Sequence, residues 1–388
     1  MLSQAPARHL RPTRLSGARA RIRAFAPWPE VFASWLAARV VVLAALLLSS
    51  YVQQQVELLD GVHLRTVSLL GWDAAWYDRI AATSYDTQDV QALRFFPLVP
   101  LLARGLGWVL GGHPGLALLL MANVGAVLYA AGLHRLALLE GLGQAAARRV
   151  LWVAALAPAG FVLVMGYTEA VYGLLLVGAF LALRTRRWLV AALFGALAGT
   201  SRPTGVLLAL PAAIEAFRGL RAAGGRQLVA RSLAVLAPAA GLASYLGWNR
   251  VHHGDWFRPF TVQARPGLRG GLLVDTRHQV AQALGDLPSQ VHPTVLHLPW
   301  VAVASTLLVV SARRLPLSFT AFAAVTLALG LTARELSSFE RYAGSDVPLL
   351  LAAALVCGGR LRAPALLAGG AGLLGMYAVL AFLRLYTP

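Results

Sequence analysis

The stretch Gly71-Trp72-Asp73-Ala74-Ala75-Trp76-Tyr77-Asp78-Arg79-Ile80-Ala81 lies soon after the first long apolar segment of the chain. It is polar and rich in aromatic side chains, whereas most of the surrounding sequence is apolar. Acidic residues are scarce, because the 388 residues include only 16 Asp and Glu, and two of them lie here. An aspartate beside tryptophans at a membrane–water boundary can act as a base on a substrate that is held in lipid.

The rest of the chain has the composition of a membrane protein. Hydrophobic residues make up 58% of the sequence and charged residues 13%. Apolar runs about 20 residues long, bounded by arginine or by Gly and Pro, are typical of membrane-spanning helices. We therefore predict an all-α polytopic membrane protein with about 11 transmembrane helices. The predicted spans are 31–52, 115–138, 149–166, 169–184, 188–201, 203–218, 229–250, 294–312, 315–333, 345–358 and 363–384.

The net charge of +18 comes from arginine alone, because the chain contains no lysine. The arginines cluster at the ends of apolar segments, as the positive-inside rule predicts for cytoplasmic loops. This placement argues against nucleic acid as a partner, although such a basic chain would otherwise suggest it. We expect residues 1–30 to form a basic cytoplasmic tail that touches anionic membrane lipids.

The segment 94–112 decides the topology. It is apolar, but Pro97, Pro100 and Arg104 interrupt it. If it lies in the membrane interface without crossing, every compact arginine cluster falls on the cytoplasmic side together with the N-terminus. If it crosses, all those clusters face outward, so we predict an interfacial helix. Residues 31–388 then form one multi-pass domain in the cell membrane, with outer loops at 53–114 and 251–293 and an extracytoplasmic active site.

Asp73 is the first candidate for chemistry in this outer region. Its alternative role is a helix N-cap, and its aromatic neighbours Trp72, Trp76 and Tyr77 could form an interfacial belt. Asp78 is predicted to be structural or to contact the acceptor substrate.

Glu169 and Arg202 also fall on the predicted outer side. Acids at a membrane boundary tend to be functional, and Glu169 could orient substrate or Arg202; alternatively it is a carboxylate favoured by a helix start. Arg202 departs from the positive-inside trend, which favours contact with a specific anion such as phosphate over headgroup snorkelling. Arg341 and Tyr342 present the same choice, with Glu335 and Glu340 as structural partners for Arg341.

Other chemistries find little support in the sequence. The histidines of the 251–293 loop and its flanks match no metal-ligand spacing, so no metal site is predicted. A Walker A motif and a dinucleotide fingerprint after a strand are both missing from the sequence, which argues against a soluble nucleotide-sugar site of Rossmann type.

Several of these pieces together resemble the bacterial branch of the PIG-V mannosyltransferases, within the GT-C membrane glycosyltransferases. The resemblance covers about 70–345 and rests on the ordered set Trp72-Asp73-Ala74-Ala75-Trp76-Tyr77-Asp78-Arg79-Ile80-Ala81, Phe95-Phe96-Pro97-Leu98-Val99-Pro100-Leu101, Gly166-Tyr167-Thr168-Glu169-Ala170, Thr200-Ser201-Arg202-Pro203-Thr204-Gly205 and Arg341-Tyr342. Towards the C-terminus only Arg341-Tyr342 matches.

The resemblance implies a GT-C bundle with interfacial helices in the first outer loop, and an enzyme that transfers mannose with inversion. The donor would be a polyprenyl-phosphate sugar, a co-substrate in place of a cofactor, and the acceptor a lipid or glycan hydroxyl. Asp73 would be the general base. Trp72, Trp76, Tyr77, Asp78, Glu169, Arg202, Arg341 and Tyr342 would bind substrate. Since eukaryotic members work with an accessory membrane protein, a partner subunit is left open.

Two alternatives to this function remain at the level of sequence. One is a GT-C enzyme for another sugar, or one that transfers to protein. The other is a multi-pass transporter or flippase, which would place ionisable residues near mid-membrane in repeated segments. Arg39 and His134 are the main residues of that kind here, and we expect both to be explained by local contacts.

Overall fold

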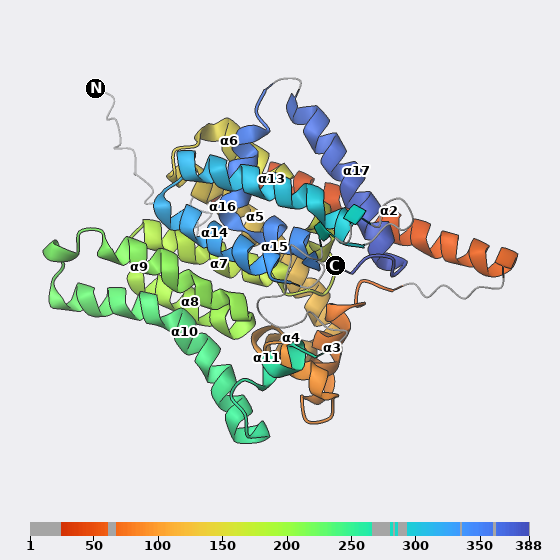
Figure 1. Ribbon diagram of the computed structural model, residues 1–388, viewed down its shortest axis with the longest axis horizontal. Coiled ribbons are helices and arrows are strands. Elements are labelled where there is room, and N and C mark those ends of the chain that lie inside the picture. Colours follow the sequence, from red (N-terminus) through yellow and green to blue (C-terminus); the bar gives the residue numbers. More distant parts are fainter. Residues whose placement is uncertain are drawn as a thin grey trace, which may run out of the picture.

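The computed structural model describes residues 25–60, 67–265, 280–281, 284–285, 293–333, 336–359 and 362–387. Within these residues the regular elements are all helices (Figure 1). Five of the described helices are long and apolar enough to cross a bilayer, namely Trp28–Glu57, Pro114–Leu139, Gly225–His253, Thr294–Arg314 and Ala363–Phe382. The prediction of a helical membrane protein is therefore confirmed, and the count of about 11 spans remains a prediction.

Most of the helices overlap the predicted spans, with differences at several ends. The long helices are α2 (Trp28–Asp60), α5 (Pro114–Leu139), α10 (Gly225–His253), α13 (Pro293–Arg314) and α17 (Arg362–Phe382). The shorter ones are α3 (Asp73–Thr83), α4 (Leu98–Val109), α6 (Gly143–Ala155), α7 (Glu169–Arg184), α8 (Trp188–Ser201), α9 (Ala209–Phe217), α11 (Arg258–Gln263), α14 (Leu317–Leu331), α15 (Phe339–Ser345) and α16 (Val347–Val356). Both α7 and α8 have the predicted bounds.

Two predicted spans are interrupted in the structure. The span 149–166 is divided between α6 and the 3-10 helix η2 (Pro158–Leu163), and the span 203–218 between η3 (Pro203–Leu208) and α9. Each 3-10 helix begins at a proline, which lacks a backbone N–H and disfavours helical geometry in the residue before it. Pro158 lies inside the first of these spans and explains why that apolar run does not form a single helix, whereas Pro203 marks only the start of the second.

The predicted interfacial segment forms η1 (Val90–Arg94) and α4. With a rise of 1.5 Å per residue, α4 is about 18 Å long, too short for a hydrocarbon core of about 30 Å. Arg104 donates hydrogen bonds to the carbonyls of Ile80 at 2.7 Å and Ala81 at 2.9 Å, near the end of α3. The arginine that would be costly inside the bilayer thus ties α4 to α3, beside the predicted catalytic stretch.

A close approach between α8 and α10 fixes part of the bundle. A Cβ atom added to Gly241 would lie 2.0 Å from the carbonyl oxygen of Ala196, and one added to Gly199 would lie 2.2 Å from that of Pro238. Small residues at such crossings let two helix backbones touch, as is common between helices in membranes.

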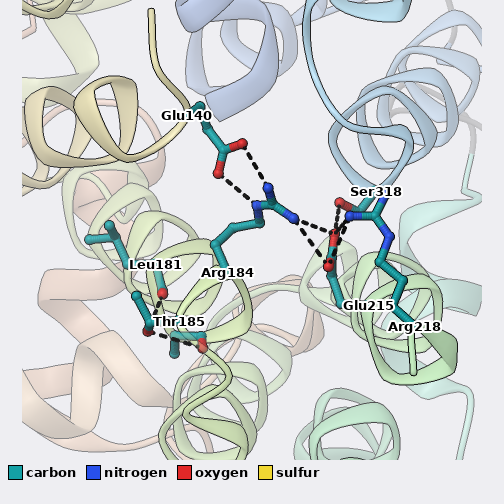
Figure 2. Close-up of polar contacts among 8 residues, drawn as sticks. Glu140, Leu181, Arg184, Thr185, Glu215, Arg218 and Ser318 are labelled. Carbon is teal, nitrogen blue, oxygen red and sulfur yellow. Dashed lines mark hydrogen bonds and ion pairs between the residues drawn. The ribbon is translucent and has the colours of Figure 1, made fainter. Parts of the chain in front are cut away.

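An ion-pair network lies at the C-terminal end of α7 (Figure 2). Arg184 donates to both oxygens of Glu140 at 2.7 and 3.1 Å and pairs with Glu215 at 3.2 Å. Arg218 and Ser318 also donate to Glu215, so the two largely buried carboxylates are well satisfied. This network holds α5, α7, α9 and α14 together on the side that the sequence predicts to be cytoplasmic.

Arg39 and His134, the ionisable residues that a transporter could place near mid-membrane, have different surroundings. Arg39, buried in α2, donates to Oδ1 of Asn123 and to the carbonyl of Leu163, both at 2.9 Å. Leu163 ends η2, so Arg39 satisfies a carbonyl that the broken helix leaves free, as expected. At His134 both buried ring nitrogens lack a hydrogen-bond partner among the described residues, and the expected local contact is not seen.

Some predictions fall on parts of the chain that the structure does not cover. Residues 1–24 of the predicted basic tail and most of 266–292 in the second outer loop lie outside the described residues, as does Glu335.

Candidate functional site

The C-terminal end of α17 holds the turn that starts α3. The Trp72 indole Nε1 donates to the carbonyl of Ala381 at 2.9 Å, and the Val67 N–H donates to the carbonyl of Phe382 at 3.0 Å. Trp72 has a φ of 55°, a conformation that costs a non-glycine residue about 1–3 kcal/mol and needs support from its surroundings. These contacts supply that support at the residue before Asp73.

Asp73 is the first residue of α3 and belongs to an ion pair. Its Oδ2 lies 2.6 Å from Nη1 of Arg341, and its N–H donates to the Tyr167 hydroxyl at 3.3 Å. Its Oδ1 has no hydrogen-bond partner among the described residues, and its side chain is 33% exposed. Since Trp72 occupies the N-cap position, the alternative N-cap role of Asp73 is not seen. One carboxylate oxygen is thus held while the other is left for a ligand.

Glu169 contacts two arginines, namely Arg341 of this ion pair and Arg202. Its side chain, at the start of α7, is 1% exposed and accepts a hydrogen bond from Nη1 of Arg202. Nε of Arg341 lies 3.4 Å from the same carboxylate oxygen, as an ion pair without hydrogen-bond geometry. The charges therefore alternate from Asp73 to Arg341, Glu169 and Arg202. The contact expected between Glu169 and Arg202 is present.

The two arginines keep their charge in this buried setting. Burial alone would lower the pKa of Arg202, but Glu169 outweighs it and the pKa is raised. For Arg341 burial again acts first, and Asp73 and Glu169 together raise the pKa well above its ordinary value. Both guanidinium groups are consequently permanent cations at the site.

A cavity of about 780 Å³ opens beside this cluster. Of the predicted site residues it is lined by Trp72, Asp73, Trp76, Tyr77, Arg202, Arg341 and Tyr342. Residues that the sequence analysis did not single out as site residues complete the lining, among them Arg94, Phe95, Phe96, Phe260 and Gln263. Distant segments, including α3, η1, α11 and α15, thus meet around one space.

One wall of the cavity is aromatic. Trp76 and Phe95 stack with ring centroids 5.5 Å apart, and Tyr77 meets the edge of Phe95 at 5.2 Å. The Arg79 guanidinium lies over the Trp76 ring, 4.1 Å from its centroid. The aromatic residues of the 71–81 stretch therefore form part of the cavity wall. The alternative interpretation was a general aromatic belt at the membrane interface.

Asp78 does not line this cavity. It lies against the start of α5, where a Cβ atom on Gly115 would be 3.1 Å from its Oδ1. Burial raises the pKa of Asp78, and a carboxylate near a helix N-terminus is favoured by the helix dipole. This placement agrees with the structural role and gives no support to the predicted substrate contact.

Glu340 has partners other than the one proposed from sequence. Both of its oxygens lie 2.8 Å from Nδ1 of His297, and Tyr386 donates to it at 2.9 Å. Glu340 does not pair with Arg341. The prediction that Glu340 could be a structural partner of Arg341 is therefore wrong. The His297–Glu340–Tyr386 cluster instead fastens α15 to α13 and to the C-terminal end of the chain.

The described residues contain no group of three or more His, Cys, Asp or Glu side chains placed to hold a metal ion. Of the histidines considered in the 251–293 loop and its flanks, His252 and His253 lie at the end of α10. His297 belongs to the cluster with Glu340, and the others lie outside the described residues. Comparison of the chain with protein-family models and with curated proteins gave no match.

Proposed function

We propose that this protein is a membrane glycosyltransferase of the GT-C type that moves mannose from a polyprenyl-phosphate carrier to a lipid or glycan hydroxyl. The observation that carries the proposal is the meeting of Asp73, Arg341, Glu169 and Arg202 at one cavity. A carboxylate with a free oxygen and two fixed cations are what an inverting transfer from a phosphate leaving group requires.

Asp73 acts as the general base in this mechanism. Its Oδ1 accepts the proton of the acceptor hydroxyl while that oxygen attacks the anomeric carbon of the sugar. The bond between the anomeric carbon and the phosphate oxygen breaks at the same time, and its electron pair leaves with the carrier phosphate. One carboxylate suffices because inversion needs no covalent enzyme intermediate.

Arg202 and Arg341 stabilise the charge that grows on the departing phosphate. The phosphate is a monoanion as the donor diester and gains negative charge as the bond breaks. Donors held in place before the reaction stabilise such charge most effectively. Glu169, buried between the two arginines, sets their positions and does not itself line the cavity.

The aromatic wall suits a sugar substrate. Trp76, Phe95 and Tyr77 all line the cavity with parts of their rings, and aromatic surface of this kind suits a sugar. In the proposed orientation, with the Arg184 network on the cytoplasmic side, this cavity faces the outer leaflet, where the lipid-linked donor would bind.

The test supplies sugar-labelled polyprenyl-phosphate mannose and a crude lipid extract to membranes that contain the parent protein or Asp73→Asn. We expect label in a new product with the parent only, and unchanged amounts of both proteins. Equal transfer by the two proteins would refute Asp73 as the base. If neither transfers mannose, the proposed donor is wrong, and carriers of other sugars are the next substrates to assay.

A further inference from the structure

The charges around the cavity do not sum to zero. Arg202 and Arg341 are matched by Glu169 and Asp73, so this cluster is neutral as a whole. Arg94 also lines the cavity and adds one further positive charge. Among the described residues, the excess positive charge of the site thus belongs to Arg94.

Among the described residues, only neutral groups hold Arg94. Its Nη1 donates to the side-chain oxygen of Gln263 and its Nε to the carbonyl of Gln91, each at 3.3 Å. Its guanidinium lies 5.2 Å from the centre of the Phe95 ring. No carboxylate contacts it among the described residues. These long hydrogen bonds orient the guanidinium without compensating its charge.

The pKa directions of the three cavity arginines reflect the same difference. Burial lowers the pKa of Arg94, and the more distant charge of Asp73 only partly offsets that effect. The pKa values of Arg202 and Arg341 are raised instead, since carboxylates contact them. An anion bound at Arg94 would raise the pKa of its guanidinium again, because a nearby negative charge stabilises the protonated form that burial disfavours.

We infer that Arg94 is an anion-binding residue of this cavity that takes a phosphate group of a lipid substrate. The inference deepens the proposed function, on which its choice of a lipid phosphate rests. The phosphate can come from two sources: the polyprenyl carrier of the sugar, or the headgroup of a phospholipid acceptor. A charge-assisted hydrogen bond to phosphate contributes about 1.5–3 kcal/mol, so its loss weakens binding by about tenfold or more.

The experiment measures equilibrium binding to purified protein in dodecyl maltoside micelles, because this uncharged detergent carries no phosphate that would compete with the probes. The probes are radiolabelled polyprenyl phosphate without sugar and radiolabelled phosphatidylglycerol, with diacylglycerol as the phosphate-free comparison. Parent, Arg94→Gln and Arg94→Lys are compared with Arg79→Gln. Arg79 is a matched control because it also lies over an aromatic ring but is exposed and does not line the cavity.

We expect Arg94→Gln to weaken binding of one phosphate probe about tenfold or more, while Arg94→Lys keeps most of the affinity and Arg79→Gln all of it. Loss confined to polyprenyl phosphate assigns Arg94 to the carrier, and loss confined to phosphatidylglycerol assigns it to the acceptor. Equal affinity of parent and Arg94→Gln for both probes would overturn the inference, as would a parent that binds neither.

Because no turnover is needed, this result is separate from that of the mannose assay. A parent that binds phosphate through Arg94 but transfers no mannose would leave the inference standing and disprove the proposed donor. Melting temperatures of the four proteins show whether each variant is folded. If Arg94→Gln does not fold, Arg94→Lys and Arg94→Met measure the same contrast between a charged and an uncharged side chain.

Discussion

Nη1 of Arg341 lies 2.6 Å from Oδ2 of Asp73, although 268 positions of sequence separate the two residues. The same guanidinium approaches Glu169 with its Nε atom. Arg341 therefore connects the proposed base to the buried carboxylate that positions Arg202. Its removal should disturb chemistry more than substrate binding.

We predict that Arg341→Gln lowers kcat of mannose transfer by about 100-fold or more, because loss of one preorganised donor to a developing anion has an effect of that size. KM for the donor should change much less. Steady-state kinetics in nanodiscs measure both quantities, and Arg79→Gln serves as the control for loss of a nearby positive charge. A variant with raised KM and normal kcat would contradict the proposed role.

Glu169→Gln should destabilise the protein. The side chain is 1% exposed and contacts two arginines, so its neutralisation leaves two cations facing each other in a buried place. Breaking a buried ion pair in this way costs about 3–5 kcal/mol. Thermal unfolding in detergent measures the effect, with Asp73→Asn as the comparison. Asp73 is 33% exposed, so its variant should unfold closer to the parent temperature. Equal melting temperatures for Glu169→Gln and parent would contradict this prediction.

Trp72→Phe should lower stability by about 1 kcal/mol and reduce kcat, because it removes the hydrogen bond from the indole to the Ala381 carbonyl. The aromatic face remains, so loss of activity would come from a less firmly held turn before Asp73. Trp108→Phe is the matched control, since Trp108 is 83% exposed on α4. Identical effects of the two substitutions would show that the hydrogen bond is unimportant.

Gly241→Ala should separate α8 from α10 locally and destabilise the bundle by about 1–3 kcal/mol, the usual effect of overpacking. The new methyl group would meet the Ala196 carbonyl at 2.0 Å, and backbone atoms cannot move aside as a side chain can. Gly369→Ala on α17 is the control, because nothing lies within 4 Å of its added Cβ. Unfolding temperatures should fall for the first variant only.

The proposed orientation can be tested by cysteine labelling. In a Cys357→Ser background, Asp86→Cys and Arg221→Cys place single thiols at exposed positions on the predicted outer and cytoplasmic sides. A membrane-impermeant maleimide applied to intact cells should modify the thiol at 86 and spare the one at 221. Permeabilised cells should show labelling of both. The reverse pattern in intact cells would invert the topology and move the cavity to the cytoplasmic side.

Much of the helical pattern could be predicted from the sequence, because apolar length and arginine placement are local signals. α7 and α8 have the predicted bounds for that reason. The continuation of α2 to Asp60 was missed, since polar residues there looked like a loop. The hydrogen bond from Gln53 to Glu57, one turn apart, lies within that continuation.

The composition of the site was only partly predictable. The sequence indicated Asp73, Glu169, Arg202 and Arg341 and the contact between Glu169 and Arg202, but the position of Arg341 between Asp73 and Glu169 depends on packing between α3, α7 and α15. Arg94 precedes the recognisable Phe95-Phe96-Pro97 motif and was missed, because its lack of an acidic partner appears only in three dimensions. Glu340 was misassigned for the related reason that adjacency in sequence does not place it beside Arg341.

The attachment of the α3 turn to the end of α17 also bears on when the protein can first act. During synthesis the N-terminal part of a chain emerges and folds first. Asp73 would enter the membrane long before Arg341 is made, and Ala381, which receives the Trp72 indole, follows Arg341 by about 40 further positions of the sequence. The incomplete polypeptide would thus lack both the cation beside its base and the anchor of the turn. The site around Asp73 would therefore be complete only after α17 has been made and has inserted.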